Sequence, residues 1–94
     1  MRIAGYIDHP ALKITIFQLE NKFIVKFESG LFELAYKYRM GEGVDSVQDI
    51  HHLVDDAFIH DVQEQMAGMR RTHAAALQRQ APGDDVDEAF EEII

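Results

Sequence analysis

Three side chains with metal-binding chemistry recur at a spacing of four residues in the second half of the chain. His52, Asp56 and His60 fall within about 80° of arc on a helix, because residues four apart in a helix are neighbours. Imidazole and carboxylate groups at this spacing bind zinc and other divalent ions. The same face lacks the HExxH pattern of metalloproteases, and exposed His and Asp side chains on a polar helix face are usually just solvated. A metal- or small-ligand-binding protein is therefore the first alternative function.

Residues suited to covalent catalysis are few. The chain has no cysteine, which excludes a thiolate nucleophile and Cys-ligated metal sites. Its two serines have structural explanations, Ser29 in a turn and Ser46 at the N-terminus of a helix. Adjacent acids such as Asp55 and Asp56 do not face a common point on a helix. An enzyme with an unrecognised site is the second alternative, and the sequence predicts no catalytic residue, no metal ligand and no cofactor.

The elements that position these residues follow from the hydrophobic pattern. The first forty residues are rich in Ile, Val, Phe and Tyr, and turn signals interrupt them, as is typical of antiparallel strands. We expect four strands joined as a meander, over residues 3–7, 12–19, 23–28 and 31–38.

The turn between the last two of these strands predicts a register. A two-residue turn at Ser29 and Gly30 would pair Phe27 with Phe32 and place aromatic and aliphatic side chains on one face. The opposite face would gain a pair between Lys26 and Glu33, but it is not cleanly polar. There are three explanations for this second face. The tail or the first strand covers it, or a longer turn exchanges the two faces, or it is a protein interface. Its apolar residues are Phe17, Leu19, Ile24, Leu31 and Ala35.

Residues 47–79 contain no proline and are expected to be helical. One straight helix of this length would measure about 50 Å, against about 27 Å for an eight-residue strand. Its apolar stripe also shifts by about one residue near residues 55–61. The segment is therefore either one long helix whose halves face different partners, or two consecutive helices. Met66 and Met69 favour a core position, and they join the candidate interface if the second half of the helix pairs with another chain.

The formal charge of −8 is concentrated at the C-terminal end. Residues 83–94 contain six acids and no base, so they carry −6 and leave −2 for residues 1–82. The segment is interpreted as a frayed acidic tail, as a helix that folds onto its own chain or a dimer mate, or as a peptide that binds a foreign groove. The helical alternatives rest on apolar residues at positions i, i+4, i+7 and i+8, which are Val86, Phe90, Ile93 and Ile94. Phe90 completes the candidate interface.

Length and composition limit the remaining function classes. Ninety-four residues, 47% of them hydrophobic, fit one small globular domain. The net acidity opposes nucleic-acid binding less for residues 1–82, which carry only −2. What still opposes it there is the lack of a basic stripe beyond Arg70, Arg71 and Arg79. No apolar run approaches a membrane span, and residues 1–8 reach an acid too soon for a signal peptide, so we expect no membrane contact and a cytoplasmic location.

Together these patterns predict an α+β domain over residues 1–82, with residues 83–94 as an acidic tail. Its architecture is a four-stranded antiparallel β-meander followed by one long or two consecutive α-helices packing on one face of the sheet. The favoured function is a small non-catalytic interaction or adaptor domain that self-associates as a homodimer, with a possible protein partner for the tail.

Overall fold

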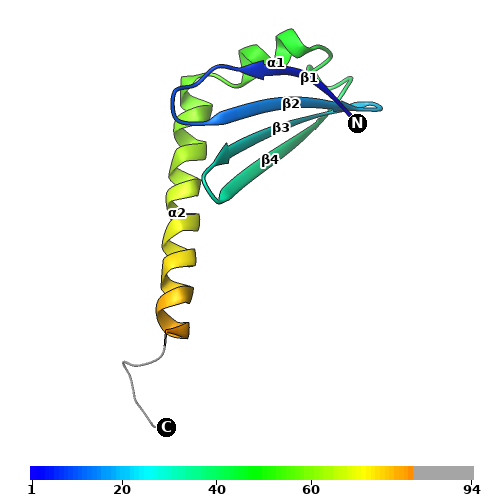
Figure 1. Ribbon diagram of the computed structural model, residues 1–94. Coiled ribbons are helices and arrows are strands. Elements are labelled where there is room, and N and C mark those ends of the chain that lie inside the picture. The colour runs from blue at the N-terminus through cyan, green and yellow to red at the C-terminus, as the bar shows by residue number, and fades with distance from the viewer. Residues whose placement is uncertain (82–94) are drawn as a thin grey trace.

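The computed structural model describes residues 1–81 and has the predicted α+β architecture (Figure 1). The four antiparallel strands lie in the sheet in chain order, so each strand pairs with its neighbours in sequence. Two helices follow the sheet. The acidic segment and Phe90, which the sequence analysis singled out, lie outside the described residues. The elements are β1 (Arg2–Ile7), β2 (Lys13–Leu19), β3 (Lys22–Ser29), β4 (Phe32–Arg39), α1 (Val47–Leu53) and α2 (Asp56–Gln80).

The two tight hairpins share one turn geometry. Each turn has two residues, and the first of them lies in the left-handed region, Glu20 with φ 53° and Gly30 with φ 61°. Because glycine takes this conformation without steric cost, Gly30 occupies the first turn position and Leu31 the second. The predicted turn at Ser29 and Gly30 is therefore displaced by one residue.

The displaced turn changes the register of β4 but not its faces. Phe27 lies opposite Leu34, two residues beyond the predicted partner Phe32. A shift of two residues leaves every side chain of β4 on its predicted face, because side chains alternate along a strand with a period of two, but it moves Leu31 out of the strand into the turn. The predicted ion pair between Lys26 and Glu33 is retained as a diagonal contact, with 4.0 Å between Nζ and Oε1.

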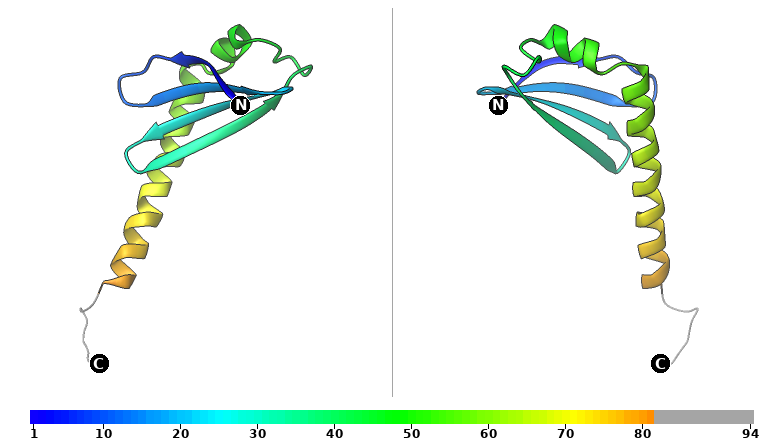
Figure 2. Two further views of the ribbon diagram at one scale, coloured as in Figure 1. Left: turned by 45° about the vertical axis from the view of Figure 1, so that its right-hand side comes forward. Right: turned by 180° about the vertical axis from the view of Figure 1, so that it is seen from behind.

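The hydrophobic core lies on one face of the sheet. On this face β2 and β3 contribute side chains that are at most 2% exposed, and both helices close over them (Figure 2). Burial of one such side chain stabilises the fold by about 1.5–3 kcal/mol. The most completely buried residues are Ile14, Ile16, Phe23, Val25, Phe27, Ile50, Val62 and Met66.

The helical region consists of two helices separated at Val54 and Asp55. The Oδ1 atom of Asp55 accepts a hydrogen bond of 2.9 Å from the N–H of Phe58, which caps the start of α2. Ser46 caps α1 in the same way, as predicted, and accepts a hydrogen bond of 3.2 Å from the N–H of Asp49. Of the two predicted alternatives the structure has the two consecutive helices, and Val54, only 4% exposed, anchors the junction in the core.

An aromatic cluster attaches the first half of α2 to the sheet. Phe58 stacks on Phe27, with ring centroids 5.7 Å apart, and meets the edge of Tyr36 at 5.2 Å. The hydroxyl of Tyr36 donates a hydrogen bond of 2.7 Å to Oε1 of Gln65. Next to this cluster, burial raises the pKa of Tyr38, and the nearby Tyr36 adds to the effect.

The second half of α2 extends beyond the sheet. Met66 is 1% exposed, Met69 is half-buried, and every residue from Arg70 to Ala81 is exposed. Figures 1 and 2 show this part of the helix standing clear of the strands. The length mismatch predicted from the sequence is therefore present even though the helical region is divided. Neither described helix is long and apolar enough to cross a membrane.

Candidate functional site: the outer face of the sheet

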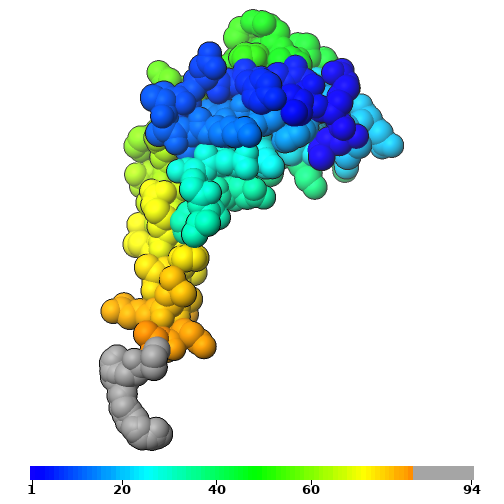
Figure 3. All heavy atoms as spheres, in the orientation of Figure 1, coloured from blue at the N-terminus to red at the C-terminus, as the bar shows by residue number. Residues whose placement is uncertain are grey.

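The face of the sheet opposite the core, here called the outer face, carries an apolar row across three strands. Ile3 of β1 lies opposite Phe17 of β2, which in turn lies opposite Ile24 of β3. Ile3 is 51% exposed, whereas Phe17 and Ile24 are half-buried between their neighbours. Both described helices pack on the other side of the sheet, so no described element covers this row. In Figure 3 the strands form the near surface of the molecule.

Strand β1 contributes two residues to the outer face that the sequence analysis did not identify. The register between β1 and β2 shifts between Ile3 and Gly5, which leaves Ala4 as an extra residue. Strict alternation would place Ile3 and Tyr6 on opposite faces, but the extra residue brings both to the outer face. Tyr6 is 55% exposed and lies opposite Thr15. The available signal was Gly5, because a glycine inside a strand is typical of a bulge.

The glycine also admits the first helix. A Cβ atom on Gly5 would lie 3.4 Å from Cγ1 of Val47 and 3.9 Å from Cδ1 of Ile16. Val47 is the first residue of α1, so α1 packs closely over β1 at this point. The bulge and the close approach together fix β1 with Ile3 and Tyr6 facing outward.

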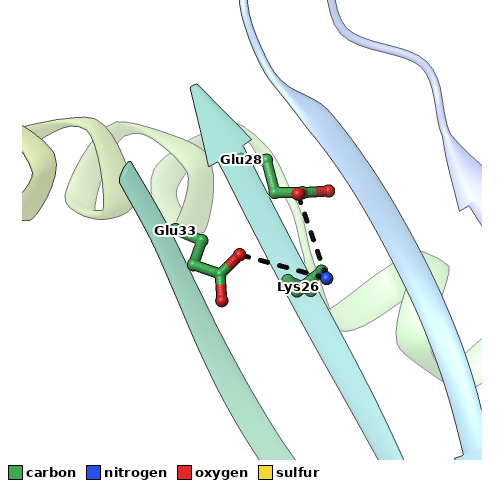
Figure 4. Close-up of polar contacts among 3 residues, drawn as sticks. All are labelled: Lys26, Glu28 and Glu33. Carbon is green, nitrogen blue, oxygen red and sulfur yellow. Dashed lines mark ion pairs between the residues drawn. The ribbon is translucent and has the colours of Figure 1, made fainter. Parts of the chain in front are cut away.

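Lys26 lies at the centre of the outer face. Its Nζ atom is 3.9 Å from Oε2 of Glu28 and 4.0 Å from Oε1 of Glu33 (Figure 4). The same atom is 5.5 Å from the centroid of the Phe17 ring. Contacts of these kinds between partly exposed groups each stabilise a fold by no more than about 1 kcal/mol. Each of the three contacts of Lys26 is therefore weak on its own.

The residues of the predicted interface lie in different parts of the structure. Phe17, Leu19, Ile24 and Ala35 share the outer face, as predicted. Leu31 is in the hairpin turn and is 85% exposed. Met66 is a core residue, so its side chain is not available to a partner in this fold, whereas Met69 is half-buried at the edge of the core. Phe90 lies outside the described residues.

An open groove lies between the start of β4 and α2. This open groove, with a volume of about 680 Å³, is lined by Phe32, Met69, Arg71 and His73, among others. The ring of His73 meets the edge of Phe32 with 5.3 Å between the centroids. The nearby Thr72 hydroxyl donates to the carbonyl of Gly68 over 3.0 Å, so it is already paired.

The residues considered for metal binding do not share one helix. His52 belongs to α1, and Asp56 and His60 belong to α2, on the other side of the break. His60 instead lies beside Asp61, with 3.8 Å between Nδ1 and Oδ1. Within residues 1–81 no group of three or more His, Cys, Asp or Glu side chains is placed to hold a metal ion.

The outer face combines the apolar row with surrounding charged side chains, and it unites four of the eight residues of the predicted interface. The groove beside α2 contains only Met69 of that prediction. Comparisons of the chain with protein-family models, with curated proteins and with solved structures gave no significant match. What the chain binds must accordingly be inferred from its own surfaces.

Proposed function

We propose that this chain is a small non-catalytic interaction domain that self-associates through the outer face of its sheet. The observation that carries the proposal is the apolar row of Ile3, Phe17 and Ile24, which no described element covers. Contiguous apolar surface of this kind marks interaction sites on soluble domains. Tyr6 extends the row, and aromatic residues are enriched in protein interfaces.

A second copy of the chain suits this surface as a partner. Closed twofold assemblies are by far the commonest oligomers of soluble proteins. A face that spans several strands and carries both apolar and charged groups can supply an interface centre and its rim. The exposed end of α2 adds surface beyond the sheet on which a second copy can also rest.

Sedimentation velocity over a range of micromolar concentrations tests the proposal. We expect a concentration-dependent dimer for the natural sequence and a monomer for Ile24→Lys, because the substitution places a charge in the apolar row. Leu31→Lys is the matched control, since it makes the same kind of change in an exposed turn outside the outer face. A monomer at all concentrations, or equal loss of association in both variants, would contradict the proposal.

A further inference from the structure

The charges of the outer face are opposite in sign to the charge of the chain. Outward strand positions hold five of the nine basic residues and only two acids, Glu28 and Glu33, which gives this face a net charge of +3. The chain as a whole carries −8. The apolar row is thus surrounded by cations in an otherwise acidic protein. The basic residues are Lys13, Lys22, Lys26, Lys37 and Arg39.

One segment of the same chain has the complementary composition. Residues 83–94 contain six acids and no base, and four apolar residues at the spacing of one helix face. An amphipathic segment of this kind binds by placing its apolar side chains in a hydrophobic surface. Its acids can at the same time pair with a basic rim, which steers the encounter and fixes the orientation.

We propose that the outer face of one copy binds the acidic segment, residues 83–94, of a second copy, and that the exchange is reciprocal. This inference rests on the proposed self-association and names its contact. Phe90 is the anchor for the row of Ile3, Phe17 and Ile24, and the acids that flank it face the lysines at the rim. Reciprocal exchange gives a closed twofold dimer, in which each copy provides one face and one segment.

The direction of α2 favours a second copy over the segment's own sheet. From His73, the last residue of α2 seen in ring contact with the sheet, the helix carries the chain about 12 Å further to Ala81. Ile24 of β3 pairs with Lys37, which lies five residues along β4 from Phe32. It therefore lies about 17 Å along the strand from the start of β4, where α2 leaves the sheet. The segment must also pass from the helix-covered side of the sheet to its outer face.

The chain available for this path is short. Bound as the helix that its spacing predicts, residues 86–94 leave only residues 82–85 as a connection. Four extended residues span at most about 14 Å, which is less than the distance of about 17 Å along β4 alone. A second copy removes this restriction, since its segment can approach the outer face from solvent.

Charge also argues against direct contact between two outer faces. Two surfaces that each carry +3 repel one another, whereas a +3 surface attracts a segment of −6. We therefore expect association to weaken as salt is added, because exposed charge pairs are screened. Contact between two outer faces would instead strengthen with salt.

A complementation experiment with the full chain tests the exchange. Phe90→Ser damages the segment and leaves the outer face intact, whereas Ile24→Lys damages the outer face and leaves the segment intact. We expect each variant alone to associate at least about tenfold more weakly than the natural sequence. An equimolar mixture should recover a heterodimer, because it contains one intact face and one intact segment. Circular dichroism of each variant checks that the fold is retained.

Charge exchange provides an independent readout. Lys22→Glu combined with Lys37→Glu should weaken association by about tenfold or more, and Glu88→Lys with Glu91→Lys in the same chain should restore it. Lysine substitutions at Gln78 and Gln80, on the exposed end of α2, are the control for added charge alone and should not restore it.

The outcomes separate this inference from the proposed function. If Ile24→Lys abolishes association but Phe90→Ser leaves it unchanged, the outer face self-associates without the segment, and the exchange is overturned. If the natural sequence is monomeric, the proposed function itself fails. A monomer that binds a labelled oligonucleotide through Lys37 would assign the outer face to nucleic acid and overturn both, since aromatic residues beside cations also stack bases.

Discussion

The rings of Phe32 and His73 meet edge to face, with 5.3 Å between their centroids, at the point where α2 leaves the sheet. Before this contact the helix is anchored by residues such as Met66, which is 1% exposed, and after it the side chains are exposed, with Leu77 at 60%. The contact therefore marks the boundary between the half of α2 that belongs to the core and the half that does not.

Substitutions on either side of this boundary should differ strongly in stability. Met66→Ala leaves a cavity in the core and should lower the free energy of unfolding by about 2–5 kcal/mol. Leu77→Ala removes an exposed side chain and should change it by less than about 0.5 kcal/mol. Urea unfolding of monomeric samples measures both values. Equal losses would contradict the boundary.

The first position of each hairpin turn should favour glycine, so adding a glycine there should stabilise the fold and removing one should destabilise it. Glu20 occupies the same left-handed turn position as Gly30, and a residue with a Cβ atom is strained there. Glu20→Gly should therefore raise the free energy of unfolding by about 0.5–1 kcal/mol, and Gly30→Ala should lower it by about 1 kcal/mol.

Asn21 supplies the control for the glycine effect. It is the neighbouring turn residue and does not have a positive φ. Asn21→Gly should leave stability unchanged or reduce it slightly, because glycine adds entropy to the unfolded chain. Thermal unfolding of Glu20→Gly, Gly30→Ala and Asn21→Gly measures these changes in stability. A stabilising Asn21→Gly would contradict the assignment of strain to Glu20.

The break between the helices depends on the side chain of Asp55. Asp55→Ala removes the cap of α2 and should lower the free energy of unfolding by about 0.5–2 kcal/mol. Asp55→Asn keeps a side-chain oxygen for the N–H of Phe58 and should retain most of the stability. Denaturant unfolding of the pair distinguishes a capping role from a general effect of charge, which would make the two variants equal.

Alkaline pH should destabilise the fold through Tyr38. Burial raises the pKa of Tyr38 above the ordinary value of 10.0, so the unfolded chain loses this proton first. The contribution of Tyr38 to stability is complete below about pH 10 and is lost as the pH rises through the raised pKa. Urea unfolding measured across this range should show stability falling with pH, and Tyr38→Phe should reduce the slope. An unchanged slope would refute the assignment.

The sequence predicted the four strands and the helical region, and it placed Phe17, Leu19, Ile24 and Ala35 on one face correctly because side chains alternate along a strand with a period of two. Even the misplaced turn at Ser29 and Gly30 left Phe17 and Ile24 on the predicted face, since the error in register was two residues. A one-residue error would have exchanged the core and the outer face.

The sequence did not predict the position of Ile3 and Tyr6, and although it favoured a core position for both methionines, it did not separate Met66 from Met69. The bulge at Ala4 depends on how β1 fits against β2 and α1, which no local pattern specifies. Met66 and Met69 lie one helical turn apart and have the same side chain. Only the point at which α2 leaves the sheet makes Met66 a core residue and Met69 a residue at the edge of the core. The shift of the apolar stripe predicted a break near residues 55–61. Its exact place at Val54 and Asp55 is set by the cap that Asp55 gives to α2, and this hydrogen bond to Phe58 forms only in the folded chain.

The chain order of the strands has a consequence for how the protein folds. Each strand pairs with the next one along the chain, so the sheet closes only short loops and can form by adding successive hairpins. Contacts between distant segments arise only when the helices arrive, as in the stacking of Phe58 on Phe27. The rate of folding should therefore be limited by the docking of α2 on a sheet whose hairpins form within microseconds. A substitution at Phe58 should slow folding, whereas one at Leu77 should leave the rate unchanged.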